Sequence, residues 1–148
     1  MKKPPEGRPR ITSSVFYEDA PAAIDWLCRV LGFEVRMKVE GEGGRIEYSE
    51  VTFADDGLIS VHHPDNKPGR PTKSPRTVGG ANTQWLCLYL DDVDGHYERA
   101  KAQGAKIIDP PTTTDYGDEY WSDRSYRVED PEGHHWWFVQ RMREQKPR

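Results

Sequence analysis

Residues 17–35, YEDAPAAIDWLCRVLGFEV, predict a short helix that follows one strand and leads into another. Asp19 is placed to cap the helix, and Pro21 falls in its first turn, where a missing backbone N–H costs nothing. Gly32 permits the left-handed conformation in which many helices end. The apolar residues between these signals recur at helical spacing and predict one buried stripe: Ala20, Ile24, Leu27, Cys28 and Leu31.

The same order of signals returns in residues 88–107, LYLDDVDGHYERAKAQGAKI. A strand over residues 86–90 precedes a capping acid, Asp92, and Gly104 ends the helix before a new strand at residues 106–108. The stripe of this helix is Val93, Tyr97 and Ala100. Two copies of strand, helix, glycine and strand, about seventy residues apart, predict a tandem repeat of one small module.

Each module is expected to run β-α-β-β-β. The first strand covers residues 11–17, and three more follow the first helix: residues 34–39, 45–53 and 58–63. In the second module we expect a strand at residues 84–90, a helix at 93–103, a strand at 106–109 and a polar aromatic loop at 110–122. A hairpin closes that module by joining residues 125–129 to 135–140 through Asp130-Pro131-Glu132-Gly133, which fits a type I turn.

These elements predict an α+β fold of two βαβββ modules, with strands that are mainly antiparallel. We expect a disordered tail at residues 1–9, module one at 10–63 and module two at 84–140. Residues 64–83, with four prolines and three glycines, predict an extended linker, and residues 141–148 a second tail.

Composition excludes several classes of protein. The net charge is −4 and the charges are interspersed, which argues against a nucleic-acid surface. No apolar run is long enough for a membrane span or a signal peptide, so we expect neither a membrane partner nor export. Only Cys28 and Cys87 occur, in no CxxC pair, which favours a reducing compartment and predicts a cytoplasmic protein.

The chain resembles the vicinal oxygen chelate superfamily, which contains glyoxalase I, bleomycin-resistance proteins and extradiol dioxygenases. The segments that carry the resemblance are DAPAAIDWLCRVLGFEV at 19–35, LYLDDVDGHYERAKAQGAKI at 88–107 and RSYRVEDPEGHHWWF at 124–138. The resemblance implies paired modules whose sheets curl around a central groove, usually in a homodimer. In metal-dependent members a divalent ion in that groove binds two neighbouring oxygens of the substrate.

The resemblance also implies where the metal ligands would stand. They fall at Thr12, at Trp85, at Trp137 and at either Ser60 or His62. At most one of these four positions carries a competent ligand, since divalent ions are held by imidazole, carboxylate or amide oxygen. We therefore expect no metal or other cofactor. If the strand register is off by one residue, the set His62, His135 and Glu129 remains an alternative metal site.

Strand alternation predicts the groove lining independently of the family. The inward positions combine aromatic rings with a few polar groups: Thr12, Ser14, Phe16, Ser60, His62, Trp85, Tyr89, His135 and Trp137. Such a lining suits a flat or extended organic ligand.

A segment rich in aromatic residues, 116–126, is expected at the rim of the groove. There Tyr120 and Trp121 could close over a ligand while Arg124 meets an anionic or carbonyl group. Alternatively, the segment is a rigid loop in which Arg124 pairs with Asp118 or Asp123.

Three functions follow from these patterns. The first is a metal-free homodimer that binds an aromatic or amphipathic small molecule, for sequestration or resistance, without catalysis. The second is an enzyme, namely a metal-dependent lyase of the glyoxalase type, an isomerase or a dioxygenase, that uses His62 and His135. The third is a non-catalytic interaction module whose groove is filled by its own side chains. No nucleophile and base stand at a telling spacing, so the sequence identifies no catalytic residue.

Overall fold

The computed structural model describes residues 1–65 and 67–147. Its contacts divide the chain into two compact units, Met1–Gly80 and Ala81–Arg148. In the described residues, each unit carries a four-stranded sheet and an α-helix, in the order strand, helix, strand, strand, strand. The predicted α+β architecture of two βαβββ modules is confirmed.

The sheet of the first unit has the order β1-β4-β3-β2. Its elements are β1 (Ser13–Phe16), α1 (Ala20–Trp26), β2 (Glu34–Glu40), β3 (Ile46–Phe53) and β4 (Gly57–His62). β1 pairs with β4 in parallel, whereas the other pairs are antiparallel. Two 3₁₀ helices, η2 (Glu42–Gly44) and η3 (Pro75–Thr77), lie in the connections.

The first helix begins and ends as its sequence predicts, but its register changes on the way. The carboxylate of Asp19 accepts a hydrogen bond from the Ala22 N–H at 3.2 Å, and Gly32 adopts a φ of 87°. From Leu27 to Leu31 the backbone forms a π-helix, η1, whose wider turn rotates the residues that follow. Val30 is therefore buried, while Cys28, a member of the predicted stripe, is only half-buried.

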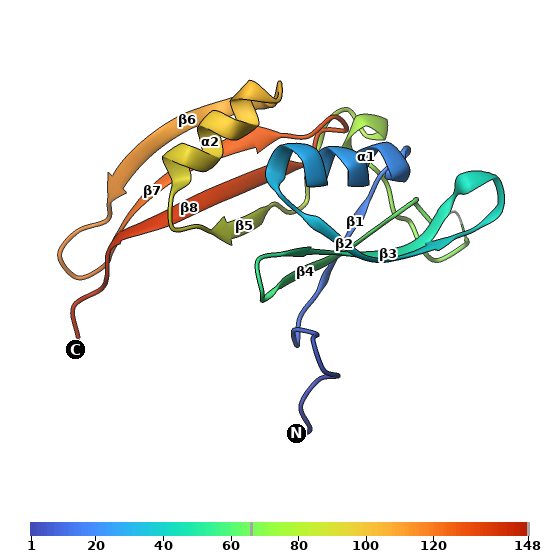
Figure 1. The fold of residues 1–148 in the computed structure, drawn as a ribbon, viewed down its shortest axis with the longest axis horizontal. Coiled ribbons are helices and arrows are strands. Elements are labelled where there is room, and N and C mark those ends of the chain that lie inside the picture. Colours follow the sequence, from blue (N-terminus) through green and yellow to red (C-terminus); the bar gives the residue numbers. More distant parts are fainter. Residues whose placement is uncertain (66, 148) are drawn as a thin grey trace. The chain divides into compact units, whose positions relative to one another are not determined.

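The second unit repeats this topology, with the order β5-β8-β7-β6. Its elements are β5 (Leu86–Tyr89), α2 (Val93–Ala102), β6 (Lys106–Asp115), β7 (Ser122–Glu129) and β8 (His135–Arg143). β5 is parallel to β8, and the two hairpins are antiparallel. The helix α2 lies across β6, β7 and β8 (Figure 1).

The core of the second unit contains a histidine that the apolar stripe did not predict. Asp92 caps α2 through the Gly95 N–H at 3.0 Å, as expected. Beneath the helix, His96 is buried in place of Tyr97, and its Nδ1 lies 2.6 Å from the Tyr126 hydroxyl. Burial raises the pKa of that hydroxyl, so it stays protonated. This hydrogen bond satisfies both polar groups inside an aromatic core.

Strands occupy much of the segment that was expected to be a loop. β6 continues through Pro110 and Pro111 to Asp115, and β7 begins at Ser122. Proline is tolerated here because β6 is an edge strand, and register shifts between Ile107 and Thr112 absorb the irregularity. β8 likewise runs three residues beyond the expected end at Gln140, because Arg143 still pairs with Ser122.

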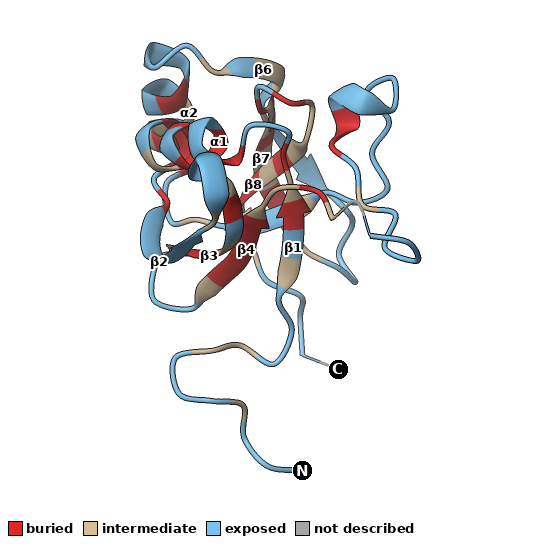
Figure 2. Ribbon diagram, turned by 90° about the vertical axis from the view of Figure 1, so that its right-hand side faces the viewer, coloured by how far each residue is buried: buried red, intermediate tan, exposed pale blue. Residues whose placement is uncertain are grey.

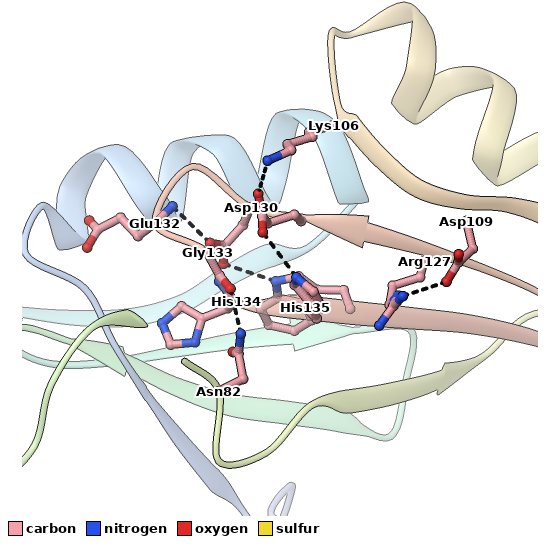
Figure 3. A network of polar contacts seen from close by, with 11 residues as sticks. Asn82, Lys106, Asp109, Arg127, Asp130, Glu132, Gly133, His134 and His135 are labelled. Atoms are coloured by element: carbon pink, nitrogen blue, oxygen red, sulfur yellow. Dashed lines mark hydrogen bonds and ion pairs between the residues drawn. The ribbon is translucent and has the colours of Figure 1, made fainter. Parts of the chain in front are cut away.

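The predicted turn at Asp130–Gly133 is confirmed, and Figure 3 shows the contacts that hold it. The Gly133 N–H donates to the Asp130 carbonyl at 3.0 Å. The Asp130 carboxylate is buried, and it accepts hydrogen bonds from the backbone of Glu132 and His134 and from the Trp136 indole, each at 3.0 Å. This one carboxylate therefore fixes both the turn and the first buried ring of β8.

Each sheet has one face covered by its helix and one face without a helix, which we call the helix-free face. Buried residues run along β4 in the first unit (Figure 2). Val15 of β1, Val51 of β3 and Val61 of β4 lie on the face that α1 covers. By strand alternation the helix-free face of unit one carries Ser14, Phe16, Tyr48, Glu50, Ser60 and His62. The helix-free face of unit two carries Trp85, Cys87, Tyr89, Arg127, His135 and Trp137.

Among the described residues, no helix has both the length and the apolar content that crossing a bilayer requires.

Candidate functional site

Three rings gather on the helix-free face of unit one. The Phe16 and His62 rings meet edge to face with centroids 4.7 Å apart, and the Tyr48 ring lies 6.3 Å from His62. The Ser60 hydroxyl lies 3.5 Å from the Tyr48 hydroxyl. Burial lowers the pKa of His62, which favours a neutral imidazole at neutral pH. The cluster is thus an aromatic surface with hydroxyl groups at one side.

A fully buried carboxylate stands beside these rings. Glu50 of β3 is 0% exposed and accepts a hydrogen bond from the Tyr48 hydroxyl at 2.9 Å. The Arg8 guanidinium also donates to its Oε1, and Arg36 Nε lies 3.5 Å from its Oε2. Among the described residues, that Oε2 has no hydrogen-bond partner. Burial by itself raises the pKa of Glu50, but the Tyr48 hydrogen bond and the two arginines outweigh it and lower the pKa.

The helix-free face of unit two is built around two tryptophans. Trp85, which is 63% exposed, lies with its ring centroid 6.3 Å from that of Trp137. The Arg127 guanidinium stacks over the Trp137 ring at 5.1 Å and is held by Asp109 at 2.8 Å (Figure 3). The Trp137 Nε1 and the Arg127 Nε are buried donors without a hydrogen-bond partner in the described residues. The site therefore presents a wide aromatic surface together with two N–H groups that lack acceptors.

Arg141 joins two of the predicted aromatic residues to this surface. Its guanidinium lies 5.1 Å from the centroid of Trp121 and 5.6 Å from that of Tyr89. Asp123 holds it through a 2.6 Å ion pair. Tyr120 is half exposed and meets the Trp121 ring at right angles, so it lies at the outer edge of this group.

Arg124 does not take either of its expected places. It makes a bidentate ion pair with Asp94 of α2, at 2.8 Å for both contacts. Because Arg124 and Tyr126 alternate with Asp123 and Ser125, the arginine lies on the helix-covered side of β7. It pairs with neither Asp118 nor Asp123, and it fastens the helix to the sheet.

The residues at the expected metal positions do not fit a divalent ion. Two are tryptophans, whose indole nitrogen donates a proton and offers no lone pair. In the alternative set, both Glu129 oxygens are engaged, one with His135 at 3.1 Å and the other with Lys106 at 2.5 Å. Across the described part of the chain, no group of three or more His, Cys, Asp or Glu is arranged to hold a metal.

The structure thus brings some predicted residues together and leaves others apart. Within unit one Ser14, Phe16, Ser60 and His62 share a face, on which Ser14 is exposed, whereas Thr12 precedes β1. Within unit two Trp85 and Trp137 form one contact pair, and Tyr89 and Trp121 share Arg141.

Four site residues were missed from the sequence: Tyr48, Glu50, Arg127 and Arg141. For the first two a signal was present, because strand alternation across residues 45–53 places Tyr48 and Glu50 opposite Val51.

The sequence of this chain is similar to those of known proteins. A family model described as Glyoxalase/Bleomycin resistance protein/Dioxygenase superfamily matches residues 10–138. The uncharacterized protein Rv0887c of Mycobacterium tuberculosis is 26% identical over 136 residues, which is 92% of this chain and 76% of that protein.

Solved structures agree with that match. TioX from Micromonospora sp. ML1 superposes with a TM-score of 0.65 at 27% identity, over 89% of this chain and 95% of TioX. TnmS3, an antibiotic binding protein from Streptomyces sp. CB03234, gives a TM-score of 0.62 at 25% identity, over 88% and 93% of the two chains. The chain belongs to the glyoxalase/bleomycin resistance protein/dioxygenase superfamily.

Proposed function

We propose that this protein binds a flat aromatic small molecule and holds it without transforming it, as a homodimer of the sequestration or resistance type. The observation that carries the proposal is the Trp85–Trp137 pair on the helix-free face of unit two. An indole that is 63% exposed costs free energy in water unless a ligand or another surface covers it.

The chemistry of this face supports a ligand with oxygen acceptors. Stacking on an aromatic side chain contributes about 1–3 kcal/mol per ring for nucleic-acid bases, and a flat ligand has the same kind of face. Among the described residues the buried N–H groups of Trp137 and Arg127 lack acceptors, so a carbonyl or ether oxygen of a ligand that reached them would satisfy them. That TnmS3, at 25% identity, is an antibiotic binding protein supports the same class of ligand.

Tryptophan fluorescence tests the proposal directly. A panel of aromatic antibiotics and metabolites is titrated into the protein in EDTA, and quenching reports binding. Trp85→Ala should weaken a positive ligand by about tenfold, because one stacking surface is lost. Trp85→Phe keeps a ring at the same place and should retain most of the affinity.

The rival function, a metal-dependent enzyme using His62 and His135, predicts the opposite result. Binding would then require an added divalent ion and would be abolished by His62→Ala. A ligand bound only in the presence of metal, or consumed during the titration, would overturn the proposal. Sedimentation that gives a monomer mass would overturn its dimeric part.

A further inference from the structure

The N-terminal segment makes a contact that its composition does not predict. Residues 1–9 contain no helix or strand, yet Arg8 donates a hydrogen bond to Glu50, 42 residues further along the chain. Arg36 anchors the same segment by donating to the Gly7 carbonyl. The segment is therefore docked at two neighbouring points on the sheet of unit one.

The N-terminal segment covers the carboxylate of Glu50, and burying this charge costs free energy. A buried charge must be paired, and Glu50 is 0% exposed in the middle of β3. The side chains of Arg8 and Arg36 are each 36% exposed, so the arginines can turn to solvent, whereas the carboxylate cannot. Glu50 Oε2, unlike Oε1, receives no hydrogen bond from the described residues. The buried Glu50 carboxylate is therefore a fixed hydrogen-bond acceptor, and Arg8 is a partner that another cation can replace.

The surroundings of Glu50 match the chemistry of an organic cation. Tyr48 donates to the carboxylate at 2.9 Å, and its ring lies 6.3 Å from that of His62, which in turn contacts Phe16. A carboxylate beside aromatic faces attracts a guanidinium, amidinium or ammonium group through charge and through the ring quadrupoles. The lowered pKa of Glu50 keeps the carboxylate ionised at neutral pH.

We propose that Glu50 recognises the cationic group of an organic ligand on the helix-free face of unit one, and that Arg8 occupies this place within the chain until that ligand displaces it. This inference goes beyond the proposed function, because it concerns the rings and the carboxylate of unit one and not the Trp85–Trp137 pair. The N-terminal segment then acts as an internal competitor, which lowers the apparent affinity by the fraction of protein in which Arg8 is docked.

Three small probes of matched shape test the inference on the full chain: benzamidine, which is cationic, benzamide, which is neutral, and benzoate, which is anionic. Binding is followed by NMR through the backbone signals of residues 48–62 and of residues 1–9. We expect benzamidine to bind at least fivefold more tightly than the other two and to shift the signals of residues 1–9 towards those of a free chain.

Two variants and one control separate the parts of the inference. Arg8→Ala should raise the affinity for benzamidine by about fivefold without changing that for benzamide, because the internal competitor is gone. Glu50→Gln should remove the preference for benzamidine. Arg10→Ala is the matched control, since Arg10 contacts only Met1 and Lys2 among the described residues and should change nothing.

The outcomes are distinct. Equal binding of the three probes, a preference for benzoate, no binding of any probe, or an unchanged preference in Glu50→Gln would each overturn the inference. If Glu50→Gln does not fold, the Arg8→Ala result decides, and an unchanged benzamidine affinity there overturns the inference. Quenching of Trp85 by neutral aromatic compounds is measured separately, so the proposed function can stand when this inference fails, and the reverse.

Discussion

The two units have the same topology, yet their helix-free faces carry opposite chemistry. Ser14 and Cys87 each stand five residues before the Asp that caps the next helix, so they occupy equivalent positions. In unit one, Ser14 pairs across the sheet with Ser60 of β4, which pairs with Glu50 of β3. In unit two, Cys87 pairs with Trp137 of β8, which pairs with Arg127 of β7. An acid and a base thus take the same place in the repeat.

The helix-covered faces do not differ in this way. Val15, Val51 and Val61 in unit one and Val128 and Phe138 in unit two are all buried beneath a helix. Packing against a helix requires apolar side chains, because an unpaired polar group there loses its hydrogen bonds to water. The helix-free faces are released from that requirement, which is why the same fold can present a carboxylate in one unit and an indole surface in the other.

The largest expected effect is the difference in stability between variants on the two faces of β8. Trp136→Ala removes a ring that is 1% exposed and leaves the Asp130 carboxylate without one of its donors, which should lower the free energy of unfolding by about 3–5 kcal/mol. Trp137→Ala, on the helix-free face, should cost about 1 kcal/mol but weaken ligand binding by about tenfold, because one of the two stacking rings is lost. Urea unfolding of both variants checks this, and equal losses of stability would contradict the division into two faces.

A smaller effect should appear at Glu50. Glu50→Gln weakens charge-assisted hydrogen bonds and should lower the free energy of unfolding by about 1.5–3 kcal/mol at neutral pH. Because the folded pKa of Glu50 lies below its ordinary value of 4.5, this contribution is complete above that pH and is lost as the pH falls through the folded pKa.

The wild type and Glu50→Gln should therefore converge in stability under acid conditions. Urea midpoints of both proteins, measured from neutral pH down to about pH 3, test this. A difference that stayed constant with pH would show that the glutamine acts through packing alone.

The smallest effect is expected at the equivalent position in unit two. Arg127→Ala loses the stacking over Trp137 and the ion pair with Asp109, which should cost about 0.5–1 kcal/mol. Arg127→Lys keeps the charge but not the planar stacking group, and should recover part of the loss. Urea unfolding of the two Arg127 variants checks this, and a loss at Arg127 as large as that of Glu50→Gln would break the contrast.

Prediction from sequence succeeded where neighbours along the chain decide the structure. The caps at Asp19 and Asp92, the left-handed Gly32 and the turn that begins at Asp130 are confirmed. It failed where packing overrides local preference, as in the π-helix that displaces Cys28 from the stripe. β6 likewise passes through two prolines, because an edge strand needs no donor on its outer side.

The sequence by itself determined the two βαβββ modules and the aromatic residues that share the helix-free face of each sheet, since capping, turn chemistry and the alternation of strand side chains act within a few residues. Only the tertiary structure decided the partners of the charged groups. Arg8 binds Glu50, and Arg124 binds Asp94 rather than its near neighbours in the chain. Such pairs join residues 42 and 30 positions apart, and an ion pair is selected by the distance between strands and helices in space, which no local pattern encodes.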